Sequence, residues 1–339
     1  MRRRAPVFAL FFLSPLVGEY FSGTTLPIVL IFLIVPFALF YGSGAVLIRE
    51  TTRRTGRGWP AIITLGLAFG VLEEGVLTQS LFNPNYLAQD LHLLDPGYIE
   101  ALGIGLLWTV FVLGGHMLWS IAAPIEIVEE SARDRRTTPW LGRTGLVVVT
   151  VLFLLGCVME FAVTKAEDAD APFSASPAQI GVSAAIAALL VLVAFLLPHG
   201  DRRPAPGRAP SPWLVLAATV IAGIGWGLLA GASSLPSWQA SIAIALVCLI
   251  VLAVLVARWS RRDGWGPRHR FAVAAGALAT SGWHAFAMDY SKPPVLDAVS
   301  RTIYLLAAAA ILWVAARKIR QEDPVTAGAQ PQDAGSATA

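Results

Sequence analysis

The sequence predicts an all-α protein, a polytopic bundle of about ten transmembrane helices with its N-terminus and C-terminus in the cytoplasm. Three observations support this prediction. Of the 339 residues, 56% are hydrophobic and only 14% are charged, whereas a soluble domain carries roughly 25% charged residues. The apolar residues fall in runs of about 17–23, the length at which a helix crosses a hydrocarbon core of ~30 Å. Basic residues gather in alternate connections between these runs.

The apolar runs give the predicted helices in chain order. The first run follows Arg2, Arg3 and Arg4 and ends at Glu19. Because no small-residue cleavage site follows it, we expect an uncleaved first helix rather than a signal peptide. Each later run is bounded by loops that carry basic residues, prolines or glycines. The ten runs are 6–21, 26–48, 60–81, 102–124, 144–164, 178–197, 212–231, 239–257, 271–288 and 295–316.

The positions of the basic residues predict the orientation. With the N-terminus inside, alternation places 22 of the 25 lysines and arginines on the cytoplasmic side, as the positive-inside rule requires. The other three are Lys165, Lys292 and Arg301. The basic charge is therefore spread over several short loops, which argues against a nucleic-acid surface. We expect a multi-pass protein of the cell (plasma) membrane whose partner is the lipid bilayer.

A proline-rich segment at 199–211 divides the chain. We expect it to be a cytoplasmic linker between the first five transmembrane helices, in residues 1–198 with the candidate polar site, and the last five, in residues 212–320. Such a division is typical of the inverted repeats of secondary transporters, although inspection finds no self-similarity between the halves. Residues 321–339, rich in Ala, Gly, Gln, Pro and Asp, are expected to form a disordered tail.

Ionisable residues within the apolar runs mark the candidate site, because a charge at the bilayer centre costs ~2.5–3.5 kcal/mol on insertion scales. The sharpest signal is the pair Glu73 and Glu74. Adjacent helical residues point about 100° apart, so one carboxylate can act as a base while the other binds a donor or a cation. We predict catalytic roles for Glu73, Glu74, His116 and His284, and binding roles for Glu19, Gln79, Asp289 and Arg301.

These residue types predict acid–base chemistry. A buried glutamate oriented by a histidine can activate water. Glutamate and histidine are also ordinary zinc ligands, so a divalent metal is compatible with the site. The sequence does not require one, because the H-E-x-x-H spacing is absent and ligands from three helices would be needed. Cys157 and Cys248 lie singly in apolar runs, too few for a thiolate site.

The segment around the glutamate pair resembles the first motif of the CAAX-protease and bacteriocin-processing (CPBP) intramembrane proteases. That motif has two glutamates, three residues, an arginine and an apolar pair; this chain has Glu73, Glu74, Leu81 and Phe82, with Thr78 in place of the arginine. The second and third motifs correspond in order to the segments 111–116 and 284–289, with altered spacing. The resemblance implies a glutamate-activated water that cleaves a peptide bond, with His116 and His284 supporting an oxyanion.

Three functions remain open. The first is an intramembrane hydrolase acting on a membrane-embedded peptide. The second is a secondary transporter of a small solute, proton-coupled through Glu73 or Glu74; ten helices with both ends inside is also the layout of the drug/metabolite transporter superfamily. The third is a non-catalytic membrane subunit, in which the two glutamates only neutralise Arg301 or bond to neighbouring groups. Convergence of the predicted residues would favour the first.

Overall fold

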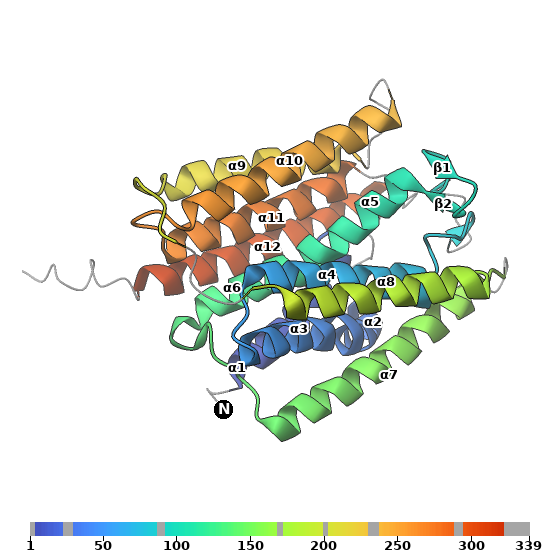
Figure 1. Cartoon of the computed structure of the whole chain (residues 1–339), viewed down its shortest axis with the longest axis horizontal. Coiled ribbons are helices and arrows are strands. Elements are labelled where there is room, and N and C mark those ends of the chain that lie inside the picture. The colour runs from blue at the N-terminus through green and yellow to red at the C-terminus, as the bar shows by residue number, and fades with distance from the viewer. Residues whose placement is uncertain are drawn as a thin grey trace, which may run out of the picture.

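The computed structural model describes residues 4–22, 30–86, 92–167, 172–198, 203–229, 237–287 and 294–321. Most of these residues are helical, which confirms the all-α prediction, and they form ten helical segments that run roughly side by side (Figure 1). Two segments are divided by a π-helical turn, and two end in one. The first four segments are α1 (Ala5–Pro15) with the turn Leu16–Tyr20; α2 (Leu30–Phe37), Ala38–Gly42 and α3 (Ser43–Arg54); α4 (Trp59–Leu72) with Glu73–Leu77; and α5 (Leu106–Gly115), His116–Ala122 and α6 (Ala123–Ser131).

Six further helices are continuous: α7 (Arg143–Glu167), α8 (Pro177–Leu196), α9 (Pro212–Gly227), α10 (Trp238–Trp259), α11 (Pro267–Ala287) and α12 (Pro294–Gln321). A two-stranded antiparallel hairpin, β1 (Tyr98–Ile99) and β2 (Ile104–Gly105), lies in the connection before α5. The predicted linker therefore separates six helical segments from four, and the five-plus-five division is wrong. Six of the ten apolar runs already end before residue 199, so the two parts cannot form equal repeats.

The helices differ in how much of their surface the protein covers. Seven segments are long and apolar enough to cross a membrane, and the apolar segments Ala5–Tyr20 and Pro212–Gly227 are shorter. The segments with α3, α4 and α5–α6 are at least half buried, whereas α7, α8 and α10 expose most of their surface. Their exposed side chains are apolar, as lipid contact requires; they include Val147, Val151, Leu154, Val158, Leu189, Leu192, Val247, Ile250 and Val254.

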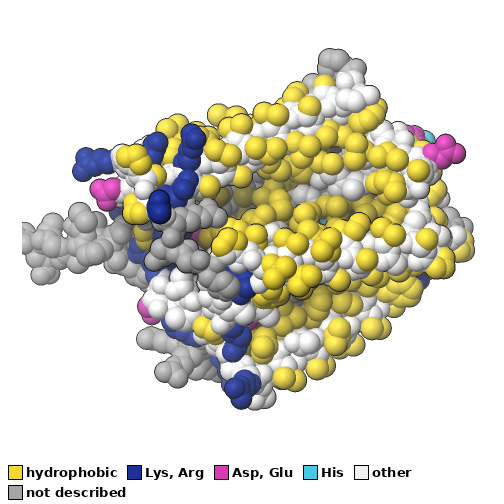
Figure 2. All heavy atoms as spheres, in the orientation of Figure 1, with side chains coloured by type: hydrophobic (Ala, Val, Ile, Leu, Met, Phe, Trp, Pro, Cys, Tyr) yellow, Lys and Arg dark blue, Asp and Glu magenta, His cyan; other side chains and the backbone are white. Residues whose placement is uncertain are grey.

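Alternate connections meet at one end of the bundle. The Arg57 side chain donates to the carbonyl of Phe195, Arg133 donates to the carbonyl of Ile319 (3.3 Å), and the amide of Ala205 donates to the carbonyl of Arg261 (2.9 Å). On the face of the molecule that Figure 2 draws, most lysines and arginines lie at this end. We call it the arginine-rich end. The basic connections, which alternate along the chain, therefore lie together at one end of the bundle. We predict that this end faces the cytoplasm.

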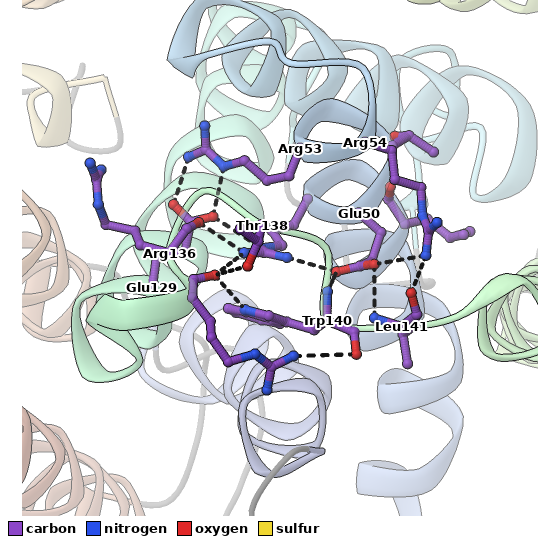
Figure 3. Close-up of polar contacts among 12 residues, drawn as sticks. Glu50, Arg53, Arg54, Glu129, Arg136, Thr138, Trp140 and Leu141 are labelled. Carbon is purple, nitrogen blue, oxygen red and sulfur yellow. Dashed lines mark hydrogen bonds and ion pairs between the residues drawn. The ribbon is translucent and has the colours of Figure 1, made fainter.

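At the arginine-rich end, α3 and α6 continue beyond their apolar runs because their charges pair with one another (Figure 3). Arg49 is fully buried and donates to Glu129 (3.0 Å) and Glu50 (2.7 Å). Arg53 donates to both oxygens of Glu129 (2.8 and 2.6 Å). In α11, Arg270 donates to Glu130 (2.6 Å). We call these six residues the ionic network.

The ionic network also holds the connection after α6. Arg49 donates to the carbonyls of Arg135 (3.0 Å) and Arg136 (2.8 Å), and its guanidinium lies 3.6 Å from the ring centroid of Trp140. Glu50 accepts the Trp140 amide (2.8 Å) and the Leu141 amide (3.1 Å). Buried charges are stable only when paired and hydrogen-bonded, and here each has several partners.

Gly42 sets the distance between α1 and the α2–α3 segment, because a Cβ at Gly42 would overlap the backbone carbonyl of Phe11. We expect Gly42→Ala to lower the free energy of unfolding by about 1–3 kcal/mol, the usual cost of overpacking. The measurement is denaturant unfolding of the purified protein in detergent. Gly181→Ala is the matched control, since a Cβ there meets nothing within 4 Å. A Gly42→Ala variant as stable as the control would contradict this packing.

Candidate active site

Four of the helical segments contain a π-helical turn, two of them between α-helices and two at the end of the segment, and each of these turns carries a polar residue. The turns contain Glu19, Tyr41, the pair Glu73 and Glu74, and His116. A π-helical turn inserts one extra residue into an α-helix and is often found at functional sites. The interruption rotates the following side chains relative to the rest of the helix. Polar residues that an unbroken helix would scatter can therefore face one centre.

The imidazole of His116 lies between the two glutamates of the neighbouring segment. Its Nε2 is 2.6 Å from Oε1 of Glu74, and its Nδ1 is 3.1 Å from Oε2 of Glu73. Nδ1 is also 3.2 Å from the hydroxyl of Ser120, one turn further along. All three ionisable side chains are buried. The predicted meeting of the α4 glutamates with a histidine of the following segment is thus present in the structure.

Glu74 is held by donors on several sides. Its Oε2 accepts hydrogen bonds from the hydroxyls of Thr78 (3.1 Å) and Ser80, and Trp108 donates its indole N–H to the Ser80 hydroxyl (3.1 Å). Its Oε1 faces His116. Both oxygens therefore have partners, so Glu74 is suited to fixing the orientation of the imidazole.

Glu73 differs from Glu74. The hydroxyl of Tyr41 donates to its Oε1. Its Oε2 makes no hydrogen bond within the described residues, although the side chain is 99% buried. Oε2 of Glu73 is therefore the carboxylate oxygen of this pair that is open to a water, a substrate or a cation.

Glu19 approaches the same centre from the end of the first segment. One ligand atom each from Glu19, Glu73 and His116 lies within 4.8 Å of the others, and these residue types can hold a metal ion. Gly18 allows this approach, because a Cβ there would lie 2.6 Å from the Ser120 hydroxyl. The predicted binding role of Glu19 is compatible with this position.

His284 is placed differently from His116. Its ring stacks on Phe111 with 5.0 Å between centroids and packs against Trp119 at 5.3 Å. Neither ring nitrogen has a well-aligned hydrogen bond to a described residue, although the ring also lies against the backbone of Ser22. The contacts of His284 are therefore mainly aromatic, and the described contacts bring Glu73, Glu74 and His116 together without it.

The other predicted binding residues lie in separate contacts. Gln79 accepts the amide of Ala175 (2.9 Å) and an N–H of Lys165 (3.4 Å), so it ties the connection before α8 to the end of α4. Gln79 adopts a φ of 61°, which lets the chain turn away after the glutamates. Arg301 pairs with Asp297 of α12 at 2.6 Å. Asp289 lies outside the described residues.

Sequence reasoning missed Tyr41, Ser120, Ser80 and Trp108. Tyr41 and Ser120 stand inside apolar runs, where a single hydroxyl carries no distinctive signal. The polar stretch that follows the glutamates, residues 78–80, was a usable signal, since hydroxyls so close in sequence can satisfy a buried carboxylate.

A groove of about 680 Å³ lies at the arginine-rich end, between α1, α6 and α12. Its walls are mostly apolar, and Arg135 and Lys318 are among its lining residues. Glu73, Glu74 and His116 do not line it. We place the candidate site at the glutamate–histidine centre because hydrogen bonds and buried charge converge there and not in this groove.

One comparison with known proteins gives a match. A family described as "Uncharacterized membrane protein family" matches residues 8–203. That range covers the six helical segments before the linker, except the first three residues of α1, and with them Glu19, Tyr41, Glu73, Glu74 and His116. No curated protein and no solved structure matches the chain. The whole glutamate–histidine centre thus lies in the matched part, whereas His284 lies beyond it.

Proposed function

We propose that this chain, which belongs to that uncharacterised membrane protein family, is a membrane-embedded hydrolase that uses Glu73, Glu74 and His116. The observation that carries the proposal is the imidazole of His116 within 3.1 Å of Glu73 and 2.6 Å of Glu74, with all three side chains buried. A carboxylate with one open oxygen beside an oriented imidazole is the arrangement that general-base activation of water needs.

The contacts suggest a role for each residue. Glu73 has the open oxygen, so it is the group that takes a proton from water. The water oxygen then adds to the carbonyl carbon of a peptide bond, and the proton passes to the nitrogen as the C–N bond breaks. His116, oriented by Glu74, can take up a proton on Nδ1, and the resulting imidazolium stabilises the negative charge that develops. Tyr41 holds the Glu73 carboxylate through its other oxygen.

Two further observations favour a hydrolase over a secondary transporter. The six-to-four division of the helices does not support two equal inverted repeats, which many transporters use. The resemblance of the 73–82 segment to the first CPBP motif also points to peptide hydrolysis. Because the contacts of His284 are aromatic, we assign the chemistry to Glu73, Glu74 and His116 and leave His284 out of it.

The proposal can be tested without knowing the substrate. Cells would express the wild-type chain, Glu73→Gln or Glu126→Gln, and new N-termini of membrane proteins would be identified by mass spectrometry. Glu126 is the matched control, since it is a buried glutamate at the arginine-rich end whose oxygens make no hydrogen bond to described residues. We expect new N-termini with the wild-type chain and with Glu126→Gln, and their loss with Glu73→Gln.

Equal amounts of each protein in the membrane, checked by immunoblot, make this comparison valid. The same set of N-termini with the wild-type chain and with Glu73→Gln would overturn the proposal, as would a wild-type chain that produces none.

A further inference from the structure

Nδ1 of His116 and Oε2 of Glu73 lie close together, and their contact favours a positive charge between the two atoms. A carboxylate oxygen can only accept, so the 2.6 Å contact with Glu74 places the proton of a neutral His116 on Nε2. Nδ1 then carries a lone pair, which faces the Ser120 hydroxyl at 3.2 Å and Oε2 of Glu73, which also carries lone pairs, at 3.1 Å. Two such atoms repel unless a cation or a proton lies between them.

The geometry around these two atoms is poor for a proton on Nδ1. Nδ1 and Oε2 are close enough, yet Oε2 makes no hydrogen bond to a described residue, because it lies off the direction of a ring N–H. A hydrogen bond needs N, H and O close to a straight line. A metal ion does not, because its bonds to Nδ1 and Oε2 meet at the ion at an angle. Bonds of 2.0–2.1 Å at a tetrahedral angle place ligand atoms about 3.4 Å apart, close to the separation seen here.

A candidate third ligand and the supporting contact are also near. One ligand atom of Glu19 lies within 4.8 Å of one from Glu73 and one from His116, so its side chain would move closer to reach an ion bound by the other two. Metal-bound histidines usually donate their other N–H to a carboxylate, which fixes the ring. Glu74 is placed to accept this hydrogen bond from Nε2. Three protein ligands leave one tetrahedral position for a water, as in catalytic zinc sites.

We infer that Glu19, Glu73 and Nδ1 of His116 bind a divalent transition-metal ion of the zinc class inside the membrane, with Glu74 as the residue that orients His116. This inference rests on the site of the proposed hydrolase and deepens it. With an ion bound, Glu73 would be a ligand in place of the base, and the ion would act as a Lewis acid that lowers the pKa of the water, whose proton would pass to the leaving nitrogen.

The test uses the full-length protein, purified in detergent with metal-free buffers and titrated with Zn²⁺ alone. Bound zinc would be counted by mass spectrometry, and its ligands would be identified by X-ray absorption. We expect about one zinc per chain, with only nitrogen and oxygen ligands at about 2.0–2.1 Å and at least one imidazole. A wild-type chain that binds no zinc, or binds it without imidazole, would overturn the inference.

Variants separate the ligands from their surroundings. Glu73→Gln and His116→Gln should lose the zinc. Glu74→Gln should keep one zinc but bind it about 10–100-fold more weakly, as for other residues that support a ligand. Glu126→Gln should bind zinc like the wild type. Unchanged zinc affinity in Glu73→Gln and His116→Gln would count against the site; the wild-type spectrum decides the matter if either variant misfolds.

The metal site and the hydrolase can fail separately. One zinc per chain with no new N-termini would keep the site and remove the hydrolase. Glu73-dependent cleavage by a chain that binds no zinc would keep the hydrolase with Glu73 as its base, and would remove the metal.

Discussion

Arg49→Leu is expected to destabilise the protein by about 3–5 kcal/mol, because it removes one partner from a buried ionic network. Arg49 is 0% exposed and bonds to Glu50, Glu129 and two backbone carbonyls. After substitution, Glu50 loses its 2.7 Å partner, and the carbonyls of Arg135 and Arg136 lose a buried donor. Unsatisfied buried acceptors are costly in a medium with little water.

The measurement is the free energy of unfolding in detergent, by denaturant titration. Arg258→Leu is the matched control, since it removes one positive charge from the same end but from an exposed side chain. We expect a change within about 0.5 kcal/mol for the control. Equal losses for the two variants would mean that the contacts of Arg49 do not hold α3 to α6.

Glu73→Gln is expected to have the second large effect, a loss of about 10²–10⁴-fold in the rate of cleavage, the usual contribution of a positioned acid–base group. An amide keeps the size of the side chain and can still accept from Tyr41, but it cannot take a proton from water or bind a metal as an anion. The rate would be measured with purified protein in liposomes and a substrate identified from cells.

Glu74→Gln should have a smaller effect on the same rate, because Glu74 acts through His116. Its amide oxygen can still accept the N–H of Nε2, although less strongly than a carboxylate. The double variant should be little slower than Glu73→Gln alone, since residues that act as a unit are not additive. A Glu74→Gln variant slower than Glu73→Gln would reverse the two roles.

Much of the fold could be predicted because the lipid bilayer permits few backbone conformations. Backbone groups inside a bilayer must be satisfied within a helix, so apolar runs such as 144–164 predicted α7 with small errors at its ends. Composition could not predict how far α3 and α6 extend into polar sequence. That extension depends on the pairing of Arg53 with Glu129, 76 residues apart in the chain. The local hydropathy of a segment does not show which distant residue it will pair with.

The candidate site could be predicted in part for the same energetic reason. Glu73, Glu74 and His116 were singled out because buried charge needs partners, and the structure brings these three side chains together. The same premise and the resemblance group His284 with them, but in the structure its ring packs against Phe111 and Trp119 instead. The π-helical turns were beyond sequence reasoning, because a one-residue insertion into a helix shifts the facing side chains without changing composition.

The most direct measurement is cleavage in H₂¹⁸O by the full-length protein in liposomes. We expect the wild-type chain to place one ¹⁸O in the new carboxylate of each product, and Glu73→Gln to give almost no labelled product. Equal labelling by both proteins would contradict the role of Glu73. A wild-type chain that labels nothing but moves a solute together with protons would contradict hydrolysis itself.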